Sequence, residues 1–222
     1  MRTAILIPVL NEEQALPSVL AEIPAEMRVV VCDNGSTDRS AEIARAAGAE
    51  VVSEPLRGYG GACLAGIAHL RADPPDAVVI LDGDHSVWLA DLPLLLAPLE
   101  EGRADMVLGD RTSLAEPGSL TPQQRVGNAI AASFIRSRTG FRYRDMGPFR
   151  AIRWGALLDL GMEDRTWGWN VEMQLKALRS GVRVMEVPVR YRARIGTSKI
   201  SGTLEGVARA GAKILWACWR YR

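Results

Sequence analysis

The chain has 222 residues with a formal net charge of +1, and its 48% apolar and 24% charged residues are typical of a globular protein that buries a sizeable core. No apolar run approaches the roughly 20 residues that a membrane-spanning helix requires. The sequence opens on a strand pattern without a cleavable signal, and its three cysteines lack metal-ligand spacing, which together predict a cytoplasmic protein with free thiols.

The first hundred residues alternate between apolar strands and helices. Strands are predicted at 3–9, 28–32, 49–53 and 77–81. Helices are predicted over 11–23, from the cap at Ser36 or Thr37 to residue 47, and from the glycine-rich segment 57–61 to residue 71. This order predicts an α/β fold with a parallel sheet and right-handed crossovers.

The strand at 77–81 ends on two carboxylates, Asp82 and Asp84. Its apolar, β-branched residues predict burial on both faces. Because ligands of open α/β sheets bind beyond the carboxyl ends of the strands, the two aspartates stand where a ligand is expected. Two close carboxylates suit a hard divalent cation, which would neutralise a substrate phosphate. The predicted activity is therefore metal-assisted and uses a nucleotide.

The glycine-rich segment 57–61 (RGYGG) has two interpretations. It is either a flexible loop that leads into a helix, or a place where Gly58 and its neighbours let a phosphate or sugar approach the backbone closely. Neither the dinucleotide fingerprint, which would need glycine in place of Cys63, nor the P-loop sequence is present.

The second half of the chain continues the pattern less regularly. Helices are predicted at 91–100 and 123–138, a strand at 105–108, and a turn with a short apolar segment at 145–150. A further helix is predicted to be capped by Asn170 and to end before Gly181, followed by a strand at 183–189. If that strand continues, Arg190, Arg192 and Arg194 share one face.

The last 40 residues are basic. Residues 183–222 carry a net charge of +7 and the remainder −6. A basic end suits a phosphate-bearing ligand or an anionic membrane, whereas the acidic remainder disfavours nucleic acid. Residues 203–222 predict an amphipathic helix, which either contacts the inner face of the membrane peripherally or packs on the catalytic domain or on a second subunit of a homo-oligomer.

Five motifs occur in register between residue 5 and about residue 200. They are residues 8–12 (PVLNE), 30–38 (VVCDNGSTD), 82–84 (DGD), 109–111 (GDR) and 194–199 (RIGTSK). Together they resemble family 2 glycosyltransferases, in the branch of dolichyl- and polyprenyl-phosphate sugar synthases. The resemblance implies the GT-A fold, a mostly parallel central sheet flanked by helices, in a catalytic domain at 1–202. It implies inverting transfer of a hexose from a UDP-glucose-like or GDP-mannose-like nucleotide sugar to a polyprenyl phosphate.

The resemblance also implies roles for single residues. Pro8, Glu12 and Asp33 would line the nucleotide pocket, with Asp33 facing the base, while Asp82 would meet the ribose. Asp84 would coordinate Mg²⁺ or Mn²⁺ bridging the diphosphate. Three later residues resemble groups that hold phosphate: Arg194, Ser198 and Lys199. The chain departs from the family at Tyr59, where lysine is common, and at residues 85–86 (HS), where the family has Leu-Gln or Gly-Gln.

Several residues have both a functional and a structural interpretation. Glu172 and Asp145 are the candidate general bases, but Glu172 also suits the first turn of a helix and Asp145 a turn. A base would be needed for a hydroxyl acceptor and not for a phosphate monoester, which is already an anion. His85 is either a metal ligand or a solvated neighbour, and Trp167 and Trp169 are either stacking surfaces or core.

Two alternative functions stay open at this point. One is a glycosyltransferase that acts on a soluble hydroxyl acceptor, and the other is a protein that binds a nucleotide sugar without catalysis. Both alternatives would have the predicted donor pocket. The identity of the acceptor distinguishes the first from a polyprenyl-phosphate enzyme, and a lack of turnover distinguishes the second.

Overall fold

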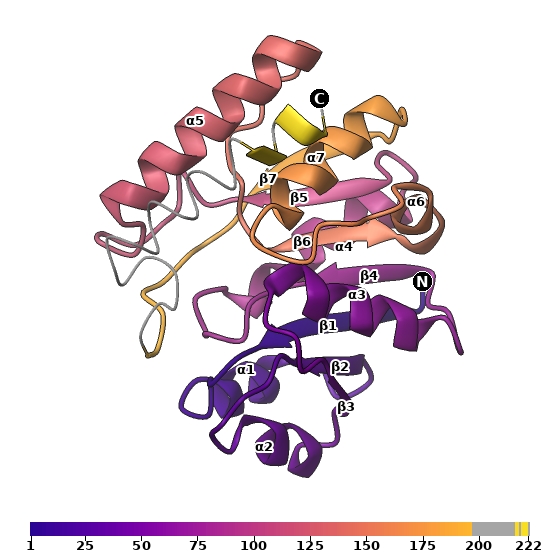
Figure 1. The fold of residues 1–222 in the computed structure, drawn as a ribbon, viewed down its shortest axis with the longest axis vertical. Coiled ribbons are helices and arrows are strands. Elements are labelled where there is room, and N and C mark those ends of the chain that lie inside the picture. The colour runs from indigo at the N-terminus through magenta and orange to yellow at the C-terminus, as the bar shows by residue number, and fades with distance from the viewer. Residues whose placement is uncertain (197–215, 218, 222) are drawn as a thin grey trace.

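One mixed sheet forms the centre of the computed structural model, which describes residues 1–196, 216–217 and 219–221 (Figure 1). Within these residues the sheet has seven strands, β1 (Thr3–Val9), β2 (Arg28–Asp33), β3 (Glu50–Ser53), β4 (Ala77–Ile80), β5 (Met106–Asp110), β6 (Arg150–Arg153) and β7 (Val184–Pro188). Their order is β3-β2-β1-β4-β6-β5-β7. All neighbours are parallel except β6, which runs antiparallel to both β4 and β5.

Helices cover both faces of the sheet. The described helices are α1 (Leu16–Glu22), α2 (Ser40–Ala46), α3 (Tyr59–Leu70), α4 (Leu92–Glu100), α5 (Pro122–Thr139), α6 (Trp154–Asp159) and α7 (Trp169–Arg179), with a short 3₁₀ turn at Leu89–Asp91. Apolar residues of α1, α2 and α4 form one core with one face of the sheet. Those of α3, α5, α6 and α7 form a second core with the opposite face.

The strands divide their side chains between these two cores. In β1, Ala4 and Leu6 belong to one core, and Ile5 and Ile7 to the other. All four are fully buried, as the unbroken apolar run predicted. Burying one leucine or isoleucine side chain contributes about 1.5–3 kcal/mol relative to exposure, so each central strand is held from both sides.

One sequence-based prediction about local structure is wrong, and one strand was not predicted. Helix α7 is capped by Gly168, so Asn170 lies inside it. After the turn predicted at 145–150, Arg150 begins the central strand β6, and its guanidinium bonds the carbonyls of Gly147 and Pro148. The strand predicted at 183–189 is present as β7, which ends at Pro188, before the three arginines. The domain boundary predicted at residue 202 lies outside the described residues.

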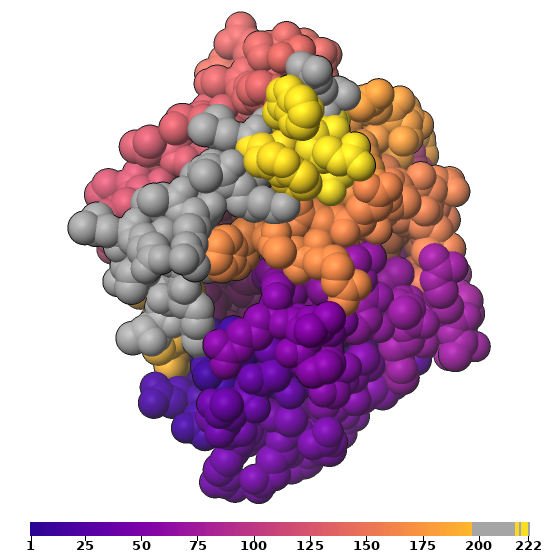
Figure 2. Space-filling model, in the orientation of Figure 1, coloured from indigo at the N-terminus to yellow at the C-terminus, as the bar shows by residue number. Residues whose placement is uncertain are grey.

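The sheet topology brings the carboxyl ends of three strands together. Strand β1 pairs in parallel with β2 and β4, so their carboxyl ends meet at one side of the sheet. Figure 2 shows the early part of the chain, in indigo and purple, in contact with the later orange segments. Five of the predicted nucleotide- and metal-binding residues lie at or just after the ends of these three strands: Pro8, Glu12, Asp33, Asp82 and Asp84.

Candidate active site

A cavity of about 750 Å³ opens at the carboxyl ends of β1 and β4. Six residues predicted to bind the donor or metal line it: Pro8, Glu12, Gly58, Asp82, Asp84 and Arg194. They come from four separate segments of the chain, namely 8–12, 58, 82–84 and 194. The tertiary structure therefore brings most of the predicted site together.

Asp82 lies in an electrostatically unfavourable position. Burial raises the pKa of its carboxyl, and the negative charge of Asp84 raises it further. Arg194, Arg111 and Arg150 act in the opposite direction without restoring the ordinary value. A cation bound beside Asp82 and Asp84 would favour the charged form of both carboxylates.

Asp84 is held in place by the turn that follows it. Its Oδ1 accepts hydrogen bonds from the backbone N–H of Ser86, at 3.0 Å, and from the Ser86 hydroxyl, at 2.5 Å. The turn is tight because His85 adopts a left-handed backbone conformation with φ of 62°. The imidazole of His85 contacts Glu22 at 2.9 Å and does not line the cavity. This geometry does not support His85 as a metal ligand.

Arg194 brings a positive charge to the acidic side of the cavity. Its Nη2 lies 3.1 Å from Glu12 Oε1, and its Nη1 lies 3.3 Å from Asp84 Oδ2. The segment that carries it is tied to the Asp84 turn, because the N–H of Ile195 donates to the Asp84 carbonyl at 2.9 Å. A guanidinium bridging two carboxylates can transfer one of these contacts to an incoming phosphate.

The three alternating arginines form ion pairs with different partners, although Arg190 and Arg192 both lie over the ring of Trp88, at 5.1 and 4.5 Å from its centroid. Arg190 pairs with Asp91 at 2.6 Å, and Arg192 pairs with Glu22 at 2.8 Å. Strand β7 has already ended at Pro188, so the continuation on which the shared face depended is absent. Only Arg194 of the three lines the cavity. Ser198 and Lys199, also predicted to hold phosphate, lie outside the described residues.

The end of β2 contributes Asn34 to the cavity, whereas the predicted Asp33 stands beside it. Asp33 Oδ1 accepts the N–H of Ser36 at 3.2 Å, and its side chain does not line the cavity. Asn34 Oδ1 accepts the N–H of Gly58 at 2.7 Å, and its amide donates to the carbonyls of Glu54 and Leu56. Asn34 therefore fixes the loop that carries Gly58.

The glycines of residues 57–61 allow a close backbone contact that neither sequence interpretation included. A Cβ at Gly58 would stand 2.1 Å from the carbonyl oxygen of Arg165, and one at Gly60 would stand 1.9 Å from that of Asp164. The close approach is thus made by the protein's own backbone. Gly58 also has φ of +155°, which disfavours any side chain there, and it lines the cavity as well.

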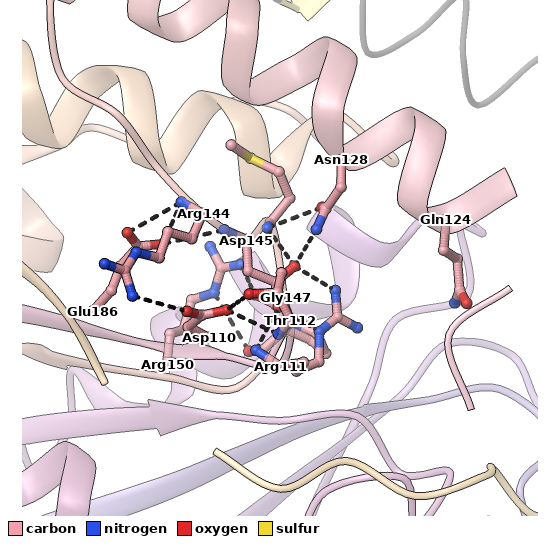
Figure 3. Close-up of polar contacts among 12 residues, drawn as sticks. Asp110, Arg111, Thr112, Gln124, Asn128, Arg144, Asp145, Gly147, Arg150 and Glu186 are labelled. Atoms are coloured by element: carbon pink, nitrogen blue, oxygen red, sulfur yellow. Dashed lines mark hydrogen bonds and ion pairs between the residues drawn. The ribbon is translucent and has the colours of Figure 1, made fainter. Parts of the chain in front are cut away.

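Asp145, a candidate base, is the centre of a buried polar cluster (Figure 3). Arg111 donates to it from Nε at 2.6 Å and from Nη2 at 2.9 Å, and the backbone N–H of Arg111 donates at 3.0 Å. Asn128 of α5 and the N–H of Met146 donate to the same carboxylate. Burial would raise the pKa of Asp145, but the Arg111 charge and these bonds outweigh it and lower the pKa.

Glu172, the other candidate base, faces away from the cavity. Its side chain is completely buried, and its two oxygens accept the backbone N–H groups of Glu163 and Asp164, each at 2.8 Å. Lys176 lies 2.8 Å from Oε1, one helical turn along α7. Neither Glu172 nor Asp145 lines the cavity, so this geometry does not support either of them as the base.

The two tryptophans have separate environments. Trp169 is fully buried in the core, while Trp167 is half-buried and lines the cavity beside Thr166. Sequence reasoning left both interpretations open for both residues. It also missed Asn34 and Thr166. Asn34 adjoins the predicted Asp33 and could have been found as a polar residue directly after a buried strand.

The residues present fit a divalent cation held partly by substrate. Among the described residues, no group of three or more His, Cys, Asp or Glu side chains could hold a metal alone. Mg²⁺ and similar hard cations are commonly bound by one or two carboxylates together with substrate phosphates. Asp82 and Asp84 supply such a pair, and both line the cavity. Among the described helices, none combines the length and apolar character of a membrane-spanning segment.

Comparisons with known proteins agree with the fold. The sequence pattern described as Glycosyl transferase family 2 matches residues 4–156. An uncharacterized glycosyltransferase of Mycobacterium tuberculosis is 44% identical over 204 residues, 91% of each chain. A dolichyl-phosphate hexose transferase of Haloferax volcanii is 35% identical over 224 residues, covering 99% of this chain and 95% of the relative.

A solved structure has the same fold. It is glucosyl-3-phosphoglycerate synthase from Mycobacterium tuberculosis in complex with Mn²⁺, uridine diphosphate and glucosyl-3-phosphoglycerate. The TM-score is 0.77 at 23% sequence identity, and the match covers 99% of this chain and 79% of that one. The architecture predicted from the sequence motifs is therefore confirmed.

Proposed function

The chain belongs to glycosyl transferase family 2 and has the GT-A fold, and on this basis we propose that it is a metal-dependent, inverting enzyme that transfers a hexose from a nucleotide sugar to a polyprenyl phosphate. The observation that carries the proposal is the convergence of Glu12, Asp82, Asp84 and Arg194 on one cavity at the carboxyl ends of the parallel strands. A nucleoside diphosphate needs both positive charge and a cleft of this size.

In the proposed site Asp84 holds Mg²⁺ or Mn²⁺ and Asp82 meets the ribose of the donor. A structure with the same fold was solved with Mn²⁺ and uridine diphosphate, which supports the use of a metal. The cation supplies compensation for the negative charge that builds on the diphosphate as it leaves the sugar. Arg194 exchanges its contact with Asp84 for a phosphate oxygen, so that its guanidinium stabilises the same developing charge. Ser86 keeps the Asp84 carboxylate oriented throughout.

The surroundings of the candidate bases favour a phosphate acceptor over a hydroxyl. Both predicted bases, Glu172 and Asp145, already accept several hydrogen bonds from the protein. A phosphate monoester is an anion near neutral pH and attacks without losing a proton to a base. The dolichyl-phosphate hexose transferase related to this chain is named for a lipid phosphate acceptor.

Helix α5 supplies a surface that suits a lipid acceptor. It lies at the edge of the molecule (Figure 1), and its Val126 and Ile130, one turn apart, are 59% and 47% exposed. Residues 119–144 include five arginines and neither aspartate nor glutamate. Apolar side chains beside basic ones match the interface of an anionic membrane. The contact predicted for residues 203–222 stays a prediction, because most of them lie outside the described residues.

Donor binding is tested first by thermal shift with UDP-, GDP- and TDP-sugars in the presence of Mn²⁺. A ligand that binds the folded state raises the melting temperature, and we expect one nucleotide class to do so. The responding donor is then incubated with polyprenyl phosphate, and the anomeric configuration of the product is determined by NMR. We expect transfer with inversion.

Two outcomes would replace this proposal with one of its alternatives. Equal or faster transfer to a soluble hydroxyl acceptor would identify that class as the substrate. Donor binding without transfer or hydrolysis, at any metal concentration, would identify a non-catalytic nucleotide-sugar-binding protein.

A further inference from the structure

Residues 163–168, which precede α7, form one wall of the cavity. Thr166 and Trp167 line the cavity on this side. The carbonyls of Arg165 and Thr166 accept hydrogen bonds from the N–H groups of Gly61, at 2.8 Å, and Gly60, at 3.2 Å. The wall therefore lies directly on the start of α3, with no space between them for a side chain.

The wall has an internal brace. Asp164 Oδ1 accepts the N–H of Thr166 at 2.7 Å and its hydroxyl at 2.8 Å, which closes the turn that leads to Trp167. Displacing Asp164 would consequently displace both residues that face the cavity. The position of the wall depends on what holds the backbone at 163–164.

Glu172 holds that backbone. Its carboxylate receives the N–H groups of Glu163 and Asp164 on separate oxygens and is neutralised by Lys176, whose ammonium also bonds the carbonyl of Gly161 at 2.5 Å. A buried carboxylate with one backbone donor on each oxygen can be replaced by no neutral side chain of equal size, since an amide has one acceptor oxygen only.

We propose that Glu172 is a positioning residue for donor binding, which acts by holding residues 163–168 so that Trp167 contacts the nucleotide sugar. This inference rests on the proposed function, because it assigns the ligand of the cavity. In this role Glu172 does not act as a base. Glu172 of α7 holds residues 163–168 on one side, and Gly60 and Gly61 of α3 bond the same segment on the other. The aromatic ring of Trp167 then supplies a flat apolar surface against a ring of the donor.

The two roles of Glu172 differ in what they change. Loss of a base lowers kcat and alters the pH dependence of the rate. Loss of a positioning residue raises the KM for the donor and leaves the pH profile as it was, because no proton transfer is removed. Its effect must also pass through Trp167, which makes the two substitutions non-additive.

The test compares Glu172→Gln, Trp167→Ala and the double variant. In Glu172→Gln one buried N–H faces an amide NH₂, and we expect the donor KM to rise about tenfold with kcat and its pH profile retained. Trp167→Ala should raise the donor KM by a similar factor, and the double variant no further than the larger single effect. Glu42→Gln, which removes an equivalent carboxylate from an exposed ion pair on α2, is the matched control and should change nothing.

Three results would overturn the inference. They are a large fall in kcat with a shifted pH profile in Glu172→Gln, an unchanged donor KM in Trp167→Ala, and fully additive effects in the double variant. Should Glu172→Gln not fold, Glu172→Asp takes its place, since it keeps the charge but withdraws the carboxylate by one carbon; an unchanged donor KM there is equally contradictory. A wild-type protein that binds no nucleotide sugar would contradict the proposed function instead.

Discussion

Two pairs of carboxylates in this protein have opposite environments. Asp82 and Asp84 face the cavity, where Ser86 and Arg194 are the main partners of Asp84 and the pKa of Asp82 is raised. Asp145 and Glu172 face the protein, and each oxygen of both carboxylates accepts at least one hydrogen bond. A buried acid is therefore available for chemistry where the protein leaves its charge incompletely compensated, and structural where it does not.

The largest expected effect is on turnover and tests the pair that faces the cavity, Asp82 and Asp84. Asp84→Asn should lower kcat by about a thousandfold even at saturating Mn²⁺, because the site loses a charged ligand of the cation and the cation's compensation of the leaving diphosphate. The variant should keep the wild-type melting temperature without ligand to within a few degrees. Asp73→Asn, an exposed carboxylate paired with Arg2, is the control. Near wild-type turnover of Asp84→Asn would remove the metal role.

The second effect is on the free energy of unfolding and tests the pair that faces the protein, Asp145 and Glu172. Asp145→Asn leaves the buried guanidinium of Arg111 without its counter-charge, and we expect the free energy of unfolding to fall by about 3 kcal/mol. Urea denaturation of both proteins at pH 7 measures this difference. A change below half that value would show that Arg111 finds another partner.

The same residue predicts a pH dependence. The folded pKa of Asp145 lies below its unfolded value, so the carboxylate stabilises the fold above the unfolded pKa of about 3.9 and loses this contribution as the pH falls through the folded pKa. Wild-type stability should consequently decrease more steeply than that of Asp145→Asn between about pH 5 and pH 2. Parallel slopes for the two proteins would contradict the lowered pKa.

The smallest expected effect concerns the exposed apolar residues of α5. Replacing both Val126 and Ile130 by glutamate should reduce flotation with vesicles of anionic lipid by about fivefold, because two apolar contacts are lost and two negative charges added. Stability should change little at these exposed positions. Neutral vesicles are the control, and equal flotation of wild type and variant with anionic vesicles would end the membrane role of α5.

Prediction from the sequence was most successful where structure depends on neighbouring residues. The alternation of strands and helices, the two-faced burial of β1 and β4 and the carboxylates after β4 all follow from local periodicity and turn chemistry. The strand β6 was missed because Arg150 and Arg153 look polar. In the structure Arg150 is buried, with its guanidinium bonded to backbone carbonyls of the preceding turn.

The features of the candidate site likewise divide into those that the sequence determined and those that only the tertiary structure decided. By itself the sequence determined the fold class, the family and the acidic pair at the end of a buried strand, because these are written in short motifs and in their order along the chain. Only the tertiary structure decided that Arg194 reaches Glu12, that the glycines at the start of α3 accommodate the backbone at 164–165, and that Glu172 faces that loop. Such contacts join residues up to 182 positions apart, and their geometry arises from packing of whole elements, which local patterns do not encode.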